Sequence, residues 1–101
     1  MQLVLCKDVT RNDYLSVEDF NKLKEIVRNY LIDTANKDEN IADTYVSYGY
    51  KSLDCVKFVS LILIELDNKP YFIEEVFYNK SKDRIFAKGE YAGVSYNFEL
   101  V

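Results

Sequence analysis

From Cys55 to the end of the chain, apolar runs are separated by short polar interruptions at residues 68–70, 79–83 and 89–93. Asparagine, glycine and proline at such intervals mark turns, and the runs between them have the length of strands. The pattern predicts a meander of antiparallel strands. It constrains the fold strongly, but it carries no chemical motif and does not say what the protein does.

The two final runs give the clearest strands. Residues 94–100 alternate apolar and polar side chains, as in a strand with one buried face. Residues 84–91 form the strand before it, and Ala92-Gly93 makes the turn between the two. Residues 71–78 read as a further strand, although Pro70 would also suit the first position of a helix.

Residues 56–67 are ambiguous because both faces of a strand would be apolar, and the same residues also match a helical spacing. The β-branched content and the Asn-Lys-Pro ending favour one central strand. The alternative is a helix over residues 53–66, with Ser52 as its cap.

The N-terminal half contains the clearest helix. Residues 2–6 read as a short strand and residues 7–15, which include Asn12-Asp13, as a loop. Ser16 can cap the helix together with Asp19. The helix should end near Thr34, and its apolar stripe comprises Val17, Phe20, Leu23, Val27, Tyr30 and Leu31.

Residues 37–40 read as a polar linker. Residues 44–50 alternate aromatic or β-branched with small polar side chains, which predicts a strand with a bulge at Gly49. Together these elements predict a single α+β domain over residues 1–101. In it, an N-terminal strand and one amphipathic helix pack on a mostly antiparallel sheet of about five strands.

The chain contains no histidine. That removes the usual general base near neutral pH, the Ser-His and Cys-His nucleophile pairs and the commonest zinc ligand. Cys6 and Cys55 are too far apart in sequence for a C-x-x-C metal site, and the glycines lack the pattern of a phosphate-binding loop. We therefore expect no catalytic residues, no metal and no cofactor.

Net charge and hydropathy bear on the partners. A formal net charge of −4 disfavours duplex DNA and anionic membranes, which reward a surplus of lysine and arginine. The longest uncharged apolar stretch, residues 58–64, is too short to span a bilayer. Two distant cysteines without a leader are typical of reduced thiols, so we expect a cytoplasmic protein.

Tyrosine is the most suggestive residue type, with nine copies. It is enriched at protein–protein interfaces because it offers a broad apolar surface with a hydroxyl at little entropic cost. If residues 44–50 form a strand, Tyr48 and Tyr50 share one face and Tyr45 points to the other. The candidate binding residues are Tyr45, Tyr48, Tyr50, Tyr71, Tyr78, Glu65 and Glu74.

Glu65 and Glu74 are candidates because a hairpin between their strands could bring two carboxylates together, although solvated charges at a strand end are the simpler explanation. One alternative function is a small-ligand binder or an enzyme with a pocket between helix and sheet, to which these two carboxylates and Tyr30 would supply polar groups. A second alternative is single-stranded nucleic acid bound at one basic hairpin, for which the candidates are Lys80, Lys82, Arg84 and Lys88.

The leading functional hypothesis is a small, acidic, non-catalytic intracellular protein-binding module. Lysine outnumbers arginine ten to three and asparagine outnumbers alanine eight to four, a bias of AT-rich coding sequences such as those of some phages and mobile elements. That bias fits an inhibitor of a host protein encoded by such an element. Its acidic surface could dock on a basic groove of the host protein. A second copy of the chain is an alternative partner, because a sheet with one helix leaves one face open.

Overall fold

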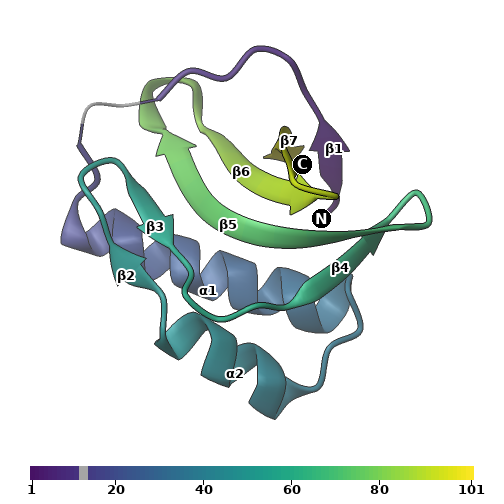
Figure 1. The fold of residues 1–101 in the computed structure, drawn as a ribbon. Helices are drawn as coiled ribbons and strands as arrows, with labels where there is room; N and C mark the ends of the chain where they lie inside the picture. The colour runs from purple at the N-terminus through teal and green to yellow at the C-terminus, as the bar shows by residue number, and fades with distance from the viewer. Residues whose placement is uncertain (12–13) are drawn as a thin grey trace.

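The computed structural model describes residues 1–11 and 14–101 as two helices packed on one side of a curved sheet (Figure 1). The α+β class expected from the sequence is confirmed, and every strand pairing among the described residues is antiparallel. The helices are α1 (Val17–Asp33) and α2 (Glu39–Ser47), and the strands are β1 (Leu3–Leu5), β2 (Tyr50–Lys51), β3 (Cys55–Lys57), β4 (Leu63–Leu66), β5 (Lys69–Asn79), β6 (Arg84–Tyr91) and β7 (Val94–Leu100).

Helix α1 begins and ends as predicted. The hydroxyl of Ser16 accepts a hydrogen bond from the backbone N–H of Asp19 at 3.0 Å, which satisfies one free donor of the first turn. Thr34 caps the other end. Most of the predicted apolar stripe packs into the core, but Val17 is exposed, because the first turn extends past the edge of the hydrophobic cluster.

The predicted strand over residues 44–50 is wrong, because most of this segment belongs to helix α2. The side chain of Asp38 caps the helix by accepting a hydrogen bond from Asn40 N–H at 2.9 Å, so the helix also begins inside the predicted linker. Its buried residues share one helical face, because Tyr45 and Val46 follow Ala42 by three and four positions. Only Tyr50–Lys51 remains extended, as β2.

Residues 56–67 form neither one continuous strand nor the alternative helix. They contribute two short strands, β3 and β4, that pair successive halves of the same edge of β5. A register shift between Ile73 and Glu75 bends β5 at the junction. The sheet consequently has seven strands rather than about five.

The C-terminal meander is confirmed. Strands β5, β6 and β7 follow each other through tight turns, and β1 adds to β7 at the far edge, which gives the order β1-β7-β6-β5-β3-β2 with β4 beside β5. Ala92 and Gly93 both adopt positive φ in the last turn, the backbone conformation of a two-residue hairpin. Pro70 lies within β5 opposite Glu65, so it does not begin a helix.

A second, smaller cluster lies on the sheet face opposite the helices. It consists of Cys55, Phe77 and Phe86, and residues 6–11 cross it (Figure 1). The guanidinium of Arg11 lies 3.9 Å from the centre of the Phe77 ring and forms ion pairs with Asp54, at 3.1 Å, and with Glu75. Residues 6–11 therefore act as a strap over this face, which a sheet with one helical layer would otherwise leave open.

Removing the Arg11 side chain should loosen this strap. Partly exposed ion pairs contribute up to about 1 kcal/mol each and a cation–π contact about as much. Cys55 beneath is buried, and burial raises the pKa of its thiol. We expect Arg11→Ala to raise the rate at which a thiol reagent labels Cys55 about fivefold or more, with Lys7→Ala, an exposed change in the same segment, as control. An unchanged rate would show that Arg11 does not hold the strap.

Candidate functional site

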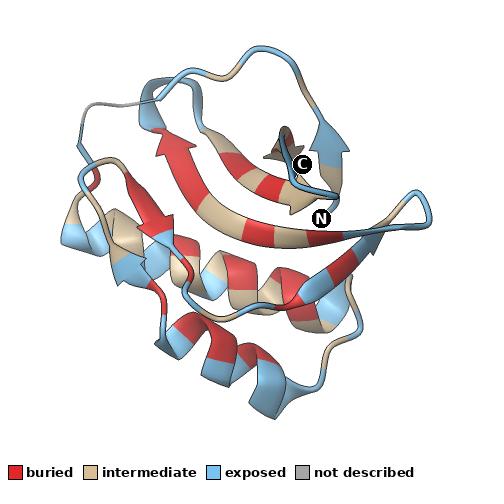
Figure 2. Cartoon of the chain, viewed as in Figure 1, coloured by how far each residue is buried: buried red, intermediate tan, exposed pale blue. Residues whose placement is uncertain are grey.

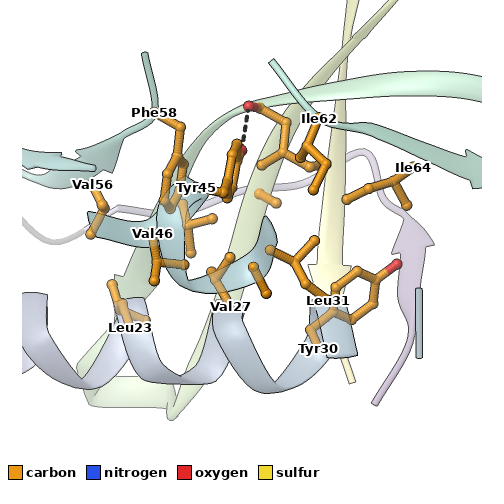
Figure 3. Close-up of a cluster of buried hydrophobic side chains, with 14 of the residues drawn as sticks. Leu23, Val27, Tyr30, Leu31, Tyr45, Val46, Val56, Phe58, Ile62 and Ile64 are labelled. Atoms are coloured by element: carbon orange, nitrogen blue, oxygen red, sulfur yellow. Dashed lines mark hydrogen bonds between the residues drawn. The ribbon is translucent and has the colours of Figure 1, made fainter. Parts of the chain in front are cut away.

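Three of the five candidate tyrosines are core residues. Tyr45 is buried between α2 and the sheet, where its ring stacks on Phe58 with centroids 4.7 Å apart and its hydroxyl donates to the carbonyl of Ile73 at 2.9 Å (Figure 3). Tyr71 and Tyr78 are buried in the same cluster. Tyr78 donates to the Asp83 carboxylate at 2.7 Å, and that hydrogen bond raises the pKa of the phenol. These rings are unavailable to a partner that docks on the folded chain.

The other two, Tyr48 and Tyr50, are on the surface where α2 passes into β2. Their exposed fractions are 61% and 49%, and Tyr14 and Leu53 nearby are 62% and 68% exposed. Two contacts hold the neighbouring segments together: Leu15 N–H donates to the carbonyl of Leu53 at 2.9 Å, and the Lys51 ammonium lies 4.7 Å from the centre of the Tyr14 ring. We call Tyr14, Tyr48, Tyr50 and Leu53 the tyrosine surface. It wraps around the β2–β3 hairpin: Tyr50 shares the sheet face of Lys57, away from the helices, whereas Lys51, with Tyr14 beside it, shares the face of the core residue Val56.

The predicted acidic pair does not form. Glu65 lies opposite Pro70 in the β4–β5 ladder and is exposed, whereas Glu74 lies at the register shift of β5 and accepts a 3.4 Å hydrogen bond from the Ser95 hydroxyl. The two carboxylates do not face each other, because the hairpin turn comes two residues earlier than a Glu65–Glu74 pairing needs, and Glu65 is a solvated charge at the strand end. Among the described residues, no group of three or more acidic or cysteine side chains could hold a metal ion.

The four candidate basic residues do not form one surface. Lys80 forms a 3.4 Å ion pair with Asp19 of α1, on the helical side of the molecule. Arg84 lies on the opposite sheet face, where it donates two hydrogen bonds to Glu99, one of them at 2.8 Å, and lowers the pKa of that carboxyl. Lys82 is exposed on the short 3-10 turn Lys80–Lys82, and Lys88 is half-buried in β6. The arrangement offers no continuous basic track for a nucleic acid backbone.

The space between helices and sheet is almost filled. It contains an apolar cavity of about 20 Å³, lined by residues such as Val27, Tyr30 and Ile73. Ligand pockets are typically about 300–1,000 Å³, and this cavity is at the size of one water molecule. Neither Glu65 nor Glu74 lines it, so the polar groups proposed for a ligand pocket are not brought together there.

The sequence interpretation missed one surface feature. Val59 and Leu61, in the connection between β3 and β4, and Leu63 of β4 are exposed. Ile41 of α2 is exposed as well, and it lines a groove of about 330 Å³ together with Leu61. The signal was present in the sequence as the second apolar face of residues 56–67, but it was assigned to a central strand covered on both sides.

Comparisons with protein-family models, with curated proteins and with solved structures each found no match. None of the helices in the described part of the chain is both long and apolar enough to cross a membrane. Function must therefore be argued from the surface of the molecule itself.

Proposed function

We propose that this chain is a small, acidic, non-catalytic intracellular module that binds another protein through the tyrosine surface. The observation that carries the proposal is the exposure of Tyr14, Tyr48, Tyr50 and Leu53, each about half exposed or more, on or next to the segment that leads from α2 through the β2–β3 hairpin. These side chains lie outside the core, so core packing does not explain why they are aromatic or apolar. Exposed tyrosine is typical of interface hot spots.

Charge favours a basic partner. The chain has a formal net charge of −4, and complementary charge accelerates encounter and selects partners. A nucleic-acid-binding groove on a host enzyme presents that kind of surface. The lysine- and asparagine-rich composition fits a phage or mobile-element inhibitor of such an enzyme, and we include this role in the proposal.

The test is affinity capture from the native host, followed by titration calorimetry with the purified captured protein. We expect the triple variant Tyr48→Ala/Tyr50→Ala/Leu53→Ala to weaken binding at least tenfold, because hot-spot truncations cost about 2 kcal/mol or more. The matched control is Val4→Ala/Val94→Ala, which removes exposed apolar groups from the opposite edge of the sheet and should bind as the unaltered chain does.

Equal binding by the triple variant and the unaltered chain would refute the role of the tyrosine surface. Failure to capture any protein would count against the function itself. All three replaced side chains are exposed, so circular dichroism should show the same folded spectrum for every variant.

A further inference from the structure

Alternate residues from Lys57 to Glu65 form one exposed stripe. Lys57, Val59, Leu61, Leu63 and Glu65 are all exposed, and the three apolar members keep 61%, 76% and 46% of their surface. Three of the four residues between them, Phe58, Ile62 and Ile64, point the other way into the main core (Figure 3). Figure 2 shows the same alternation of exposed and buried positions along β4. We call these five exposed residues the edge stripe.

The edge stripe follows one border of the sheet from the end of β3, through the connection over residues 58–62, to the edge strand β4. Among the described strands, β4 pairs with β5 alone, whereas β2 pairs with β3 up to its last residue, Lys57. Natural proteins usually place charges or proline along such a border, because an apolar edge invites association with another chain. Here three consecutive members of the stripe are apolar, and charges stand only at its two ends.

The order of those charges makes the stripe complementary to itself. It runs from a positive end at Lys57, through the apolar members, to a negative end at Glu65. If a second copy lies antiparallel, with Leu61 opposite its own equivalent, Val59 meets Leu63 and Lys57 meets Glu65. The two-fold symmetry makes each of these contacts twice. A parallel arrangement would instead place like charges together.

The surroundings of the stripe fit this arrangement. Among the described residues, neither Lys57 nor Glu65 takes part in an ion pair within the chain. Ile41 and the groove beside Leu61 widen the apolar area next to the two-fold axis. Because β2 pairs with β3 beside Lys57 and residues 58–62 form no strand, the contact between the two copies is one between side chains.

We propose that two copies of this chain associate through the edge stripe in this antiparallel arrangement. The inference goes beyond the proposed function, because the edge stripe and the tyrosine surface share no residue. A homodimer would present two tyrosine surfaces to its protein partner, and two linked contacts strengthen binding when the target offers two sites.

The test reverses the charges at positions 57 and 65. The molar mass of each variant is measured by light scattering and sedimentation equilibrium at about 1 to 500 μM protein. We expect the unaltered chain to approach twice its 11.9 kDa mass. Lys57→Glu alone and Glu65→Lys alone should each weaken dimerisation at least tenfold, because each creates two like-charge contacts. An equimolar mixture of the two variants should restore the dimer, since both contacts are then attractive, and the double exchange in one chain should restore it as well.

Leu61→Lys provides the control for position. It places two ammonium groups next to the two-fold axis, so it should remain monomeric in every mixture, while its exposed site leaves the fold intact. Lys57 lies opposite Glu75 in the β3–β5 ladder, so urea unfolding of each variant must accompany the mass measurement. A monomeric unaltered chain at all concentrations, undiminished dimerisation of both single variants, or a mixture that stays monomeric would each overturn the proposal. If the chain dimerises as expected but captures no protein from the host, the proposed function is refuted and the dimer is not.

Discussion

Replacing Phe98 with alanine is expected to lower the free energy of unfolding by about 3–5 kcal/mol, the range for deleting a buried phenylalanine ring. Phe98 of β7 is 1% exposed, and its ring stands nearly perpendicular to that of Tyr71, with centroids 5.1 Å apart. Gly89 of β6 leaves room for this ring, because a Cβ atom there would lie 3.2 Å from it. The neighbours are thus already shaped to the ring and cannot close the space that it vacates.

A loss of that size is a large part of the 5–15 kcal/mol that stabilises a typical domain. Urea unfolding followed by circular dichroism measures it, with Val94→Ala as the matched control. Val94 lies in the same strand but is exposed, so its truncation should change the free energy by no more than about 0.5 kcal/mol. A change below about 1.5 kcal/mol for Phe98→Ala would contradict the packing described for this region.

The second large effect is a loss of stability in alkali that depends on Tyr45. Burial raises the pKa of the Tyr45 phenol far above its ordinary value of about 10. Because the raised pKa belongs to the folded state, stability is fully present below pH 10. It falls as the pH rises from there towards the folded pKa, since the unfolded chain loses this proton first. One such group contributes a slope of about 1.4 kcal/mol per pH unit.

Tyr45→Phe isolates this contribution. At pH 7 the variant should be less stable by about 1–3 kcal/mol, because the buried carbonyl of Ile73 loses its hydrogen bond. Above pH 10 the difference from the unaltered chain should shrink, since the variant has no phenol to ionise at this position. Urea unfolding at pH 8, 10 and 11 measures both slopes. Burial also raises the pKa of Tyr30, and this contribution to the pH dependence is the same in the variant and the unaltered chain. If the free energy of unfolding falls with pH at the same slope in both proteins, Tyr45 does not carry the effect.

The sequence predicted the elements that depend on local signals. The Ser16 cap, the end of α1 near Thr34 and the strands at 84–91 and 94–100 follow from capping chemistry and period-two alternation, and the structure confirms them. It failed where a segment carries two periodicities. In residues 44–50, tyrosine, valine and serine alternate as in a strand, but Asp38 supplies a helix cap and Tyr45 and Val46 pack on one helical face.

The division of residues 56–67 into two strands could not be predicted locally, because it depends on pairing with two separate halves of β5, on either side of the register shift at Ile73–Glu75. The candidate site, too, was predicted only in part. Tyr48 and Tyr50 are on the surface, whereas Tyr45, Tyr71 and Tyr78 belong to the core. Composition shows that tyrosines are numerous, but only the tertiary arrangement decides which of them face solvent.

The pairing of β1 with β7 also determines how the chain responds to mechanical force. Gln2 N–H donates to the carbonyl of Val101 at 2.7 Å, and Val101 N–H donates to that of Gln2 at 2.9 Å, so residues 2 and 101 lie side by side (Figure 1). Antiparallel hydrogen bonds run perpendicular to the strands, so tension applied at residues 2 and 101 acts along those bonds. It would separate β1 from β7 one pair at a time, which needs far less force than shearing all pairs at once. Tension between residues 2 and 101 would thus meet its weakest resistance at this edge of the sheet.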